Sequence, residues 1–443
     1  MPLAFAFLLP VVSGFAALAA PLAAPDRLDL PSAISFALEH NFAIRQARER
    51  IREQHGIVST VSAAGLPNVA GAGSYQQSDV PVVQTATGQP PVFLPAGHSW
   101  RMGLTVTQTV YSGGRVRASI TGAELVREAA ILELKATVNE ALLNVRVGFY
   151  NVLLAREQVL VQEQNLALLK SQLHTTTARA EAGTTSDFER LRAEVAVANA
   201  KVPLIQARND FRLAVEDLRR VLGFTTNDPE SARKVPEFVG NLAVEPVTFD
   251  LEKSFVAAWS NRPDLQRLAK LIAAAHAGVK VARAGYLPDL KAKGGYDLRT
   301  GNNERFRDSR EGFFVGAQSH LEIQGRAVPG RVMQAEAQDA IAQLSESEAR
   351  LTVEVEVRRA FSALQQATEL SAAAQKTVDQ AVESARLATA RYDVGAATQL
   401  DVLRSQVELT TAQTSQLRAN HGFNVAIAQL RWATGVGEVG YGR

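Results

Sequence analysis

The sequence predicts an internally duplicated α/β membrane protein. In this fold, long α-helices form a coiled-coil barrel, and four β-strands are one chain's contribution to a transmembrane β-barrel. Three observations predict it. The chain repeats itself once, each copy holds one helix with a sustained heptad seam, and each copy holds two alternating runs of the length of a barrel strand.

The N-terminus has the composition of a targeting segment. Residues 3–24 form an uncharged apolar run that ends in small residues, which predicts a signal peptide at residues 1–24. A membrane anchor is the alternative, because the run is just long enough to span, but no charged stop-transfer flank follows it. No later apolar run approaches the roughly 20 residues of a spanning helix, so further membrane contact is expected through strands.

Composition excludes several classes of function. The 443 residues contain no cysteine, and the net charge is only +2, so thiol chemistry and a polyanion-binding footprint are excluded. Neither a phosphate-binding glycine loop nor a His-Glu-x-x-His pattern is present. His55 and His276 have no second ligand at helical spacing, so we expect them to be structural. We therefore expect no enzyme, no cofactor, no metal and no nucleic-acid partner.

The chain contains an internal duplication, in which one structural unit occurs twice. A shift of 221 positions aligns Asp29 with Asp250, and a shift of 212 aligns Arg179 with Arg391. The predicted organisation is a first repeat at 25–223, a Pro-containing connecting segment at 224–248, a second repeat at 249–435 and a tail at 436–443. Each repeat reads as helix, strand pair, long helix and returning helix.

The long helix carries the clearest pattern. Apolar and small residues recur at strict 3-4 spacing from Ile131 to Leu173, and the same register continues from Val353 to Tyr392. A helix over 116–181 would be about 100 Å long. The helix that returns to residue 222 and the opening helix at 31–64, repeated at 251–285, are each shorter and together flank it. Such a rod has no compact core, which predicts lateral packing in an oligomer.

Two strand-like runs occur in each copy. Residues 101–110, 290–298 and 313–323 alternate apolar and polar side chains, and segments 78–99 and 299–312 read as loops. On pattern alone, a half-buried soluble sheet is as good an interpretation as barrel strands. Four strands cannot close a barrel, and open edges are not tolerated in lipid, so membrane strands would require several chains.

The order of these elements resembles the TolC family of outer-membrane efflux proteins. The phrases that carry the resemblance are Gly65-Leu66-Pro67, Tyr286-Leu287-Pro288, residues 111–115 (YSGGR), residues 391–395 (RYDVG) and residues 400–403 (LDVL). The resemblance implies a homotrimer with four strands per chain, a helical periplasmic tunnel, and a periplasmic adaptor and an inner-membrane pump as partners. The implied function is a passive exit duct for efflux or type I secretion, at the cell outer membrane and extending into the periplasm.

The resemblance also implies a pore gate at the helical tips. Asp401 matches an acidic gate position and Tyr392 a gate-lock tyrosine, while Glu189 is the pseudo-symmetric partner of Asp401. The alternatives are a helix-start charge for Asp401 and a plain seam residue for Tyr392. Arg404 and Ala397 depart from the family pattern, standing where some members have an aspartate and a locking arginine.

The two turns at these tips are the predicted adaptor-docking sites. Their candidate residues are Gly183, Thr184, Gly395 and Ala396, with glycine supplying the left-handed turn.

Two other classes of protein remain as alternatives to an outer-membrane duct at this point. A periplasmic coiled-coil adaptor would normally have a single hairpin, and a cytosolic scaffold has no use for the strands or for the apolar N-terminus.

Overall fold

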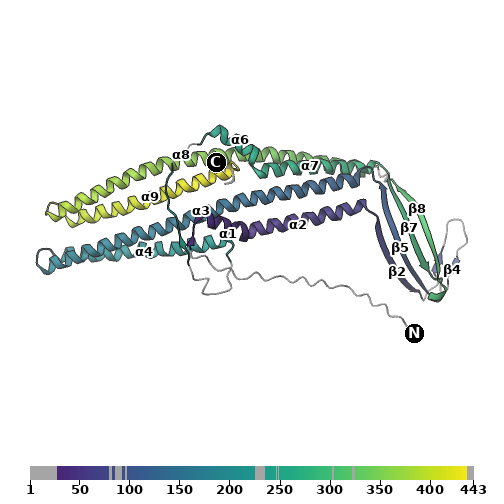
Figure 1. Cartoon of the computed structure of the whole chain (residues 1–443), viewed down its shortest axis with the longest axis horizontal. Helices are drawn as coiled ribbons and strands as arrows, with labels where there is room; N and C mark the ends of the chain where they lie inside the picture. Colours follow the sequence, from purple (N-terminus) through teal and green to yellow (C-terminus); the bar gives the residue numbers. More distant parts are fainter. Residues whose placement is uncertain are drawn as a thin grey trace. The chain divides into compact units, whose positions relative to one another are not determined.

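The structure is a computed structural model that describes residues 27–78, 82–84, 92–94, 97–224, 235–245, 247, 249–301, 304–321 and 325–436. The predicted signal peptide at 1–24 and nearly all of the C-terminal tail lie outside these residues. Two similar successions of elements follow one another in the described part (Figure 1). The first comprises α1 (Leu30–His40), α2 (Phe42–Ser62), η1 (Ala63–Gly65), β2 (Asn68–Ser78), β5 (Gly97–Tyr111), α3 (Arg115–Glu181) and α4 (Asp187–Leu222). The second comprises α6 (Leu251–Asn261), α7 (Pro263–Arg283), η2 (Ala284–Tyr286), β7 (Asp289–Arg299), β8 (Arg310–His320), α8 (Ala327–Asp393) and α9 (Gln399–Ala433).

Contacts within the chain divide it into two units that cut across this succession. Among the described residues, the first unit comprises positions up to 41, 144–243 and 374–421, and the second comprises 42–143, 244–373 and 422–436. The first unit holds the turns at the ends of α3 and α8. The second unit holds the β-sheet.

The opening helix of each repeat is broken, where the sequence predicts one continuous helix. At the break between α1 and α2, Asn41 leaves the helical region with φ −58° and ψ 127°. Its side-chain Nδ2 donates to the carbonyl of Val221 at 2.7 Å. Gly223, the left-handed cap of α4, lies against the backbone of His40. The prediction of one helix over 31–64 is therefore wrong, because a contact with the distant end of α4 fixes the break.

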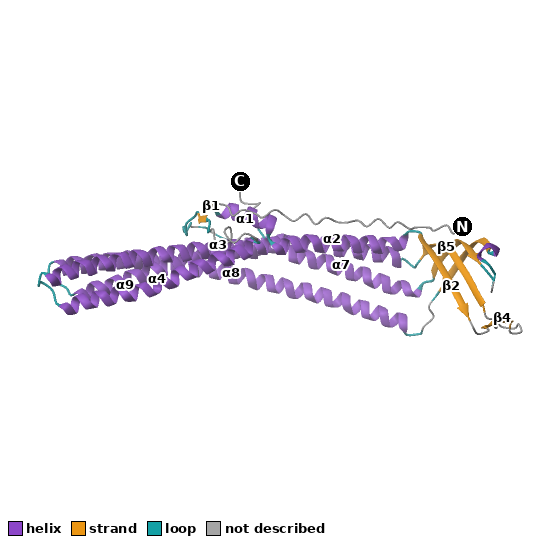
Figure 2. Ribbon diagram, turned by 90° about the horizontal axis from the view of Figure 1, so that it is seen from below, coloured by secondary structure: helices purple, strands orange, loops and turns teal. Residues whose placement is uncertain are grey.

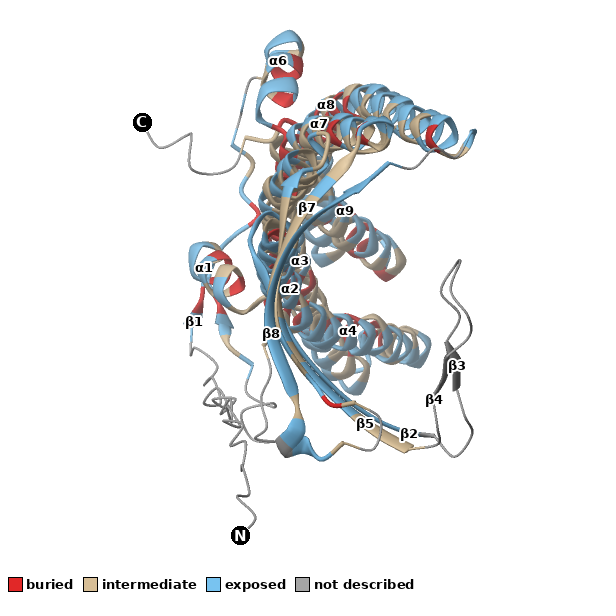
Figure 3. Cartoon of the chain, turned by 90° about the vertical axis from the view of Figure 1, so that its right-hand side faces the viewer, coloured by how far each residue is buried: buried red, intermediate tan, exposed pale blue. Residues whose placement is uncertain are grey.

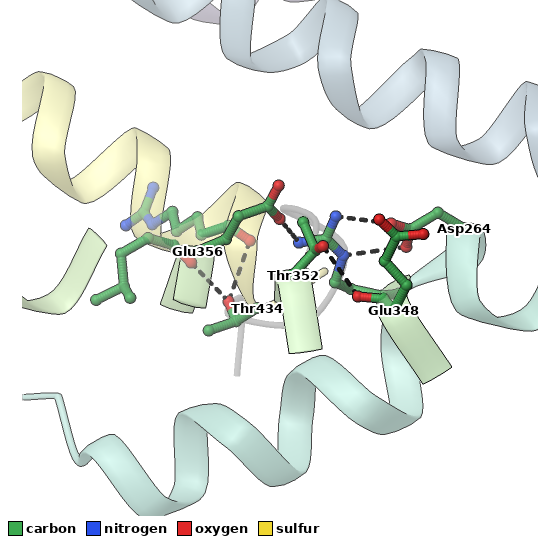
Figure 4. Close-up of polar contacts among 8 residues, drawn as sticks. Asp264, Glu348, Thr352, Glu356 and Thr434 are labelled. Carbon is green, nitrogen blue, oxygen red and sulfur yellow. Dashed lines mark hydrogen bonds and ion pairs between the residues drawn. The ribbon is translucent and has the colours of Figure 1, made fainter. Parts of the chain in front are cut away.

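The equivalent break between α6 and α7 is held by a buried arginine. The Arg262 side chain is 8% exposed and forms a two-pronged ion pair with Asp264, with Nε–Oδ1 at 3.0 Å and Nη2–Oδ2 at 2.7 Å. Its Nη1 donates to Glu356 of α8 (Figure 4), and its guanidinium lies 4.9 Å from the ring centroid of Trp432. Arg262 precedes Pro263, and a residue before proline avoids the helical region, so one local signal for this break was present in the sequence.

The central part of each predicted heptad seam is buried, whereas Ile131 at the start of the first seam is exposed. Val145 and Val152 on α3 are fully buried, and so are Val353 and Val357 on α8. In the second unit, the α8 seam packs against α6 and α9 in one cluster that includes Phe255, Phe423 and Leu430. In the first unit, a smaller cluster joins α3 to α4 through Leu166, Leu169, Val197, Ala200 and Leu204.

The four long strands form one antiparallel sheet, orange in Figure 2, and their order is β2-β5-β7-β8 (Figure 1). The pair β2/β5 comes from the first repeat and the pair β7/β8 from the second, so β5 and β7 join the repeats. The outer strands β2 and β8 each have one edge without a partner strand among the described residues. Within the predicted loop 78–99, a short pair joins β3 (Val82–Gln84) to β4 (Val92–Leu94).

The connecting segment contributes one feature that the sequence analysis missed. In the first unit, β6 (Glu237–Phe238) pairs in parallel with β1 (Arg27–Leu28), and Arg27 Nε contacts Glu237 Oε2 at 2.9 Å. The Phe238 ring lies edge-on to Phe149 and Phe211. Two-residue strands carry no periodic pattern, so no sequence signal predicts this pair.

Candidate functional site: the helical turns and the sheet

The turns that close the two helical hairpins have the same geometry. Gly183 and Gly395 have φ +71° and +75°. In the first turn, the N–H of Thr184 donates to the carbonyl of Arg179 and that of Gly183 to Ala180, both at 2.9 Å. The second turn repeats this pattern with Ala396 and Gly395 as donors. This is the Schellman arrangement, in which a left-handed residue ends the helix, so glycine is required here for its backbone conformation.

The predicted acidic gate residues both sit three residues into a returning helix. Asp401 accepts from the backbone N–H of Thr398 at 2.9 Å and from its hydroxyl at 2.7 Å, while the N–H of Asp401 donates to the same hydroxyl at 3.3 Å. These reciprocal bonds form a capping box at the start of α9. The Thr398 side-chain bond is the main reason why the pKa of Asp401 lies below its usual value, with smaller contributions from the Thr398 N–H, Arg404 and Arg391.

Glu189 has a similar but weaker environment at the start of α4. Its N–H donates to the Ser186 hydroxyl at 3.4 Å, and its carboxylate accepts from Thr185 at 2.7 Å. The Asp401 carboxylate thus caps α9, whereas the Glu189 carboxylate bonds to the Thr185 hydroxyl and Ser186 caps α4. Asp401 is exposed and remains available to a pore, whereas Glu189 is half-buried.

Tyr392 is a contact point between the two hairpins of the first unit. The guanidinium of Arg179, at the end of α3, lies 5.5 Å from the centroid of its ring. The same guanidinium is 3.6 Å from a carboxylate oxygen of Asp393. Arg179 therefore reaches from the first hairpin to two consecutive residues at the end of α8.

A second link between the hairpins lies next to the first. Gln399 is 6% exposed and Thr176 is 4% exposed, and the Gln399 amide lies 3.5 Å from the Thr176 hydroxyl. No hydrogen-bond partner within the described chain satisfies the buried Oε1 of Gln399. The weak bond and the unsatisfied oxygen mark a contact whose polar atoms are poorly matched.

The structure thus brings Tyr392 close to residues that the sequence analysis did not select. Arg179, Thr176 and Gln399 connect the hairpins, whereas Asp401 and Glu189 each bond within their own turn. The repetition of Arg179 as Arg391 was visible in the sequence. Nothing in the sequence showed that Arg179 contacts Tyr392 on the other hairpin.

The sheet has one apolar and one polar face. The apolar face pairs residues such as Val69 with Val106 and Tyr296 with Phe313 across the strands. Phe313 is 86% exposed and Val315 is 93% exposed, and Figure 3 shows β8 as exposed. An exposed apolar sheet face of this kind is unfavourable in water. It is typical of strands that face lipid.

Aromatic side chains occupy both ends of the apolar face. Tyr75 and Trp100 pack with ring centroids 4.6 Å apart at the loop end, and Tyr111 and Tyr286 lie at the helical end. The eleven residue-to-residue steps from Trp100 to Tyr111 along β5 correspond to about 35 Å of strand, or roughly 27 Å when tilted by 40°. That matches the apolar band of an outer-membrane protein, about 25 Å tall between aromatic girdles.

Two kinds of feature are absent from the described residues. None of the helices there is both long and apolar enough to cross a bilayer. No group of three or more His, Cys, Asp or Glu side chains in the same residues could hold a metal ion. His276 instead contacts Asp339, with Nδ1 and Oδ1 at 2.7 Å.

Solved structures of outer-membrane channels share this fold. The chain matches the Campylobacter jejuni CmeC outer membrane channel with a TM-score of 0.79 and 17% identity, covering 92% of this chain and 85% of that one. It matches the outer membrane protein VceC from Vibrio cholerae with a TM-score of 0.77 and 18% identity, covering 92% and 96%.

Sequence relatives extend over nearly the same length. The outer membrane efflux protein BepC of Brucella suis is 23% identical over 92% of this chain and 85% of its own length. The protein CyaE of Bordetella pertussis is 26% identical over 88% and 80%. The family model for outer membrane efflux proteins matches residues 33–224 and 256–436, which is most of the chain. The chain therefore belongs to the outer membrane efflux protein family, the TolC family, as its motifs predicted.

Proposed function

We propose that this protein is the passive outer-membrane duct of a tripartite efflux or type I secretion system and that it works as a homotrimer. The observation that carries the proposal is the four-stranded sheet with an apolar, aromatic-bordered face and two edges, β2 and β8, that have no partner strand among the described residues. An unpaired edge in lipid costs several kcal/mol for each unsatisfied polar group.

Other copies of the chain can satisfy both edges. Neighbouring strands in the sheet are all antiparallel and their number is even, so β8 of one copy can pair antiparallel with β2 of the next. Repeating this contact around an axis closes a barrel. The resemblance to the family supports three copies.

Exposed apolar rows on the helices support the same assembly. On α8, four large side chains at near-heptad spacing are between 62% and 72% exposed, namely Met333, Ile341, Leu344 and Leu351. On α4, a similar row is between 51% and 67% exposed, namely Leu191, Val195, Val202 and Ile205. Rows of this kind are coiled-coil seams without a partner, which helices of neighbouring copies would cover.

The gate in this proposal lies at the hairpin turns of the first unit. Separation of the two hairpins requires that Arg179 leave Tyr392 and Asp393 and that Gln399 leave Thr176. An adaptor that binds better to the separated state shifts the equilibrium toward it. Its docking surface would include the turn residues Gly183, Thr184, Gly395 and Ala396, and an inner-membrane pump would supply the energy.

Asp401 and Glu189 are the proposed acidic pore residues. Support for Asp401 comes from its exposure and from the lowered pKa, which keeps its carboxylate charged. Support for Glu189 is its equivalent position in the first repeat.

Membrane fractionation followed by native mass determination in mild detergent tests the assembly. We expect an outer-membrane species with the mass of three chains. A soluble or inner-membrane monomer would overturn the duct, and two or four chains would overturn the trimer alone.

A further inference from the structure

The polar face of the sheet is strongly cationic. The register assigns five cationic side chains to this face, Arg101, Lys291, Lys293, Arg299 and Arg310, and two acidic ones, Asp289 and Asp297. Asp289 already contacts Arg115 at 2.5 Å. The opposite face has one charged residue within the strands, Glu311, which bonds to the Tyr296 hydroxyl.

Three of the arginines form a row across the sheet. Arg101 of β5 is directly opposite Arg299 of β7, and Arg299 is directly opposite Arg310 of β8. Side chains opposite each other on one face have Cβ atoms about 5 Å apart, and like charges in such pairs destabilise a sheet. The stability of the folded chain therefore does not explain why Arg101, Arg299 and Arg310 are placed side by side. We call these three residues the arginine row.

The register that creates the row is firmly held. Immediately beyond it, the N–H of Thr300 donates to the carbonyl of Trp100 at 2.9 Å, and the N–H of Trp100 donates to the Thr300 hydroxyl at 2.8 Å. Thr300 is buried. These bonds keep Arg101 and Arg299 in opposition despite their repulsion.

The charges of the row are poorly neutralised. Arg310 contacts Glu304 at 3.3 Å, but its side chain is still 76% exposed. Within the part of the chain that the structure describes, no acidic side chain lies within ion-pair distance of Arg101 or Arg299, and both are exposed. Arginine presents several donors in a planar fork that suits carboxylate, sulfonate and phosphate groups.

We propose that the arginine row lines the lumen of the duct and makes that part of it selective for anions, so that the cargo includes small organic anions. This inference rests on the proposed duct. In an outer-membrane barrel the apolar side chains face lipid and the alternate ones face the lumen, and the row lies on the polar, alternate side. Lys291 and Lys293 extend the cationic surface along the same face toward the helical end of the strands.

Ion selectivity of the purified full-length protein in planar bilayers tests the proposal. The native chain is compared, in a potassium chloride gradient near 0.1 M, with a triple variant carrying Arg101→Gln, Arg299→Gln and Arg310→Gln. We expect the chloride-to-potassium permeability ratio to fall by at least about twofold, since a unit charge about 10 Å away changes the local anion concentration by roughly that factor in water. The difference should shrink near 1 M salt, where the Debye length is about 3 Å.

Glu311→Gln is the matched control, because it changes the charge of the residue next to Arg310 on the opposite face of the strand. It should leave the permeability ratio unchanged. Channels with equal ratios in the native chain and the triple variant would overturn the arginine row and leave the duct intact. Absence of channels in the native chain would instead overturn the duct itself.

Two further measurements complete the design. If the triple variant does not insert into bilayers, the native channel is tested instead for block by pyrophosphate at low salt. Block would support an anion site in the lumen at the arginine row, and no block would count against it. Binding to vesicles that contain lipopolysaccharide addresses phosphate groups of lipid. If the variant loses that binding while its permeability ratio stays native, the row serves the membrane and the lumenal proposal is wrong.

Discussion

Arg179 and Tyr392 join the two helical hairpins of the first unit, with the guanidinium carbon 5.5 Å from the centroid of the ring. Arg179 has an equivalent in the second repeat, Arg391, whose Nη2 lies only 3.4 Å from the carbonyl oxygen of Ala396 in its own turn. The duplicated sequence has therefore placed the same residue in two roles. One arginine connects the hairpins, and the other supports a single turn.

We expect Arg179→Ala to favour the separated state of the hairpins. The cation–π contact and the half-exposed ion pair to Asp393 together contribute about 1 kcal/mol, which corresponds to about a fivefold change in an equilibrium. Single-channel recording should show a matching rise in open probability. Arg391→Ala is the control and should change it little. Equal effects of the two substitutions would contradict the connecting role of Arg179.

Asp401 is expected to stay charged throughout the physiological pH range. Its folded pKa lies below its unfolded value, so its contribution to stability is present above the unfolded pKa and is lost as the pH falls through the folded pKa. In the proposed gate, the cation preference that this carboxylate confers should therefore be flat from pH 8 to 5 and be lost only in acid below the ordinary titration range of aspartate. Asp401→Asn should remove that acidic limb, as measured by reversal potential in a pH series. An inflection near pH 6 that disappears in this variant would disprove the expected titration.

The periodic parts of this fold were predictable, and the interrupted parts were not. The sequence predicted a helix over 116–181, and α3 runs from Arg115 to Glu181, because a heptad repeat is a local property that persists over many turns. The break at Asn41 depends instead on the Val221 carbonyl in α4, far along the chain. No local pattern records such a partner.

The candidate site shows the same division. Gly183 and Gly395 were found from the sequence because a left-handed turn demands glycine. The cap bonds of Asp401 are also local. Arg179, Thr176 and Gln399 were missed because their partners lie on another hairpin, and a long arginine side chain has many possible partners at that range.

Arg262 is expected to be the most sensitive polar residue of the second unit. Burial alone would lower the pKa of its guanidinium, but Asp264 and Glu356 outweigh that effect and raise it, so the group stays charged. Arg262→Ala leaves two partly buried carboxylates without their partner and should cost about 3 kcal/mol. Arg262→Lys should restore little of this lost stability, because a single ammonium group cannot bond to both carboxylates as the guanidinium does.

Denaturant unfolding of the detergent-solubilised protein, followed by circular dichroism, measures this cost. Arg350→Ala is the control, because it removes an arginine that is 64% exposed and pairs with Glu346 on the surface of α8. Its expected cost is below about 1 kcal/mol. Equal unfolding midpoints for the Arg262 and Arg350 variants would contradict a special role for the buried ion pairs.

Gly223 and Gly183 provide a matched pair of helix-ending glycines. Both have a left-handed backbone, with φ +75° and +71°, so an alanine at either position should cost about 1 kcal/mol. A Cβ at Gly183 would meet nothing within 4 Å, whereas at Gly223 it would collide with the backbone carbonyl of His40. We therefore expect Gly223→Ala to lower the unfolding midpoint clearly more than Gly183→Ala. Similar midpoints would show that the backbone at the α1–α2 break moves away from α4 to admit the added methyl group at little cost in stability.

The exposed row on α8 gives a direct test of assembly through the helices. Ile341 and Leu344 are 62% and 70% exposed within one chain, so Ile341→Asp with Leu344→Asp should leave the fold of the chain intact. In the proposed trimer each side chain would be buried, which stabilises by about 2 kcal/mol per residue, and an aspartate in its place would add a buried charge. We expect native mass determination to show single chains with unchanged helical content by circular dichroism. Gln343→Glu adds a charge at an exposed α8 position that is neither three nor four residues from any member of the row, and it should leave the mass of the assembly unaltered. A trimer that survives the double substitution would mean that the strands alone hold the copies together and that α8 does not lie in an interface between copies.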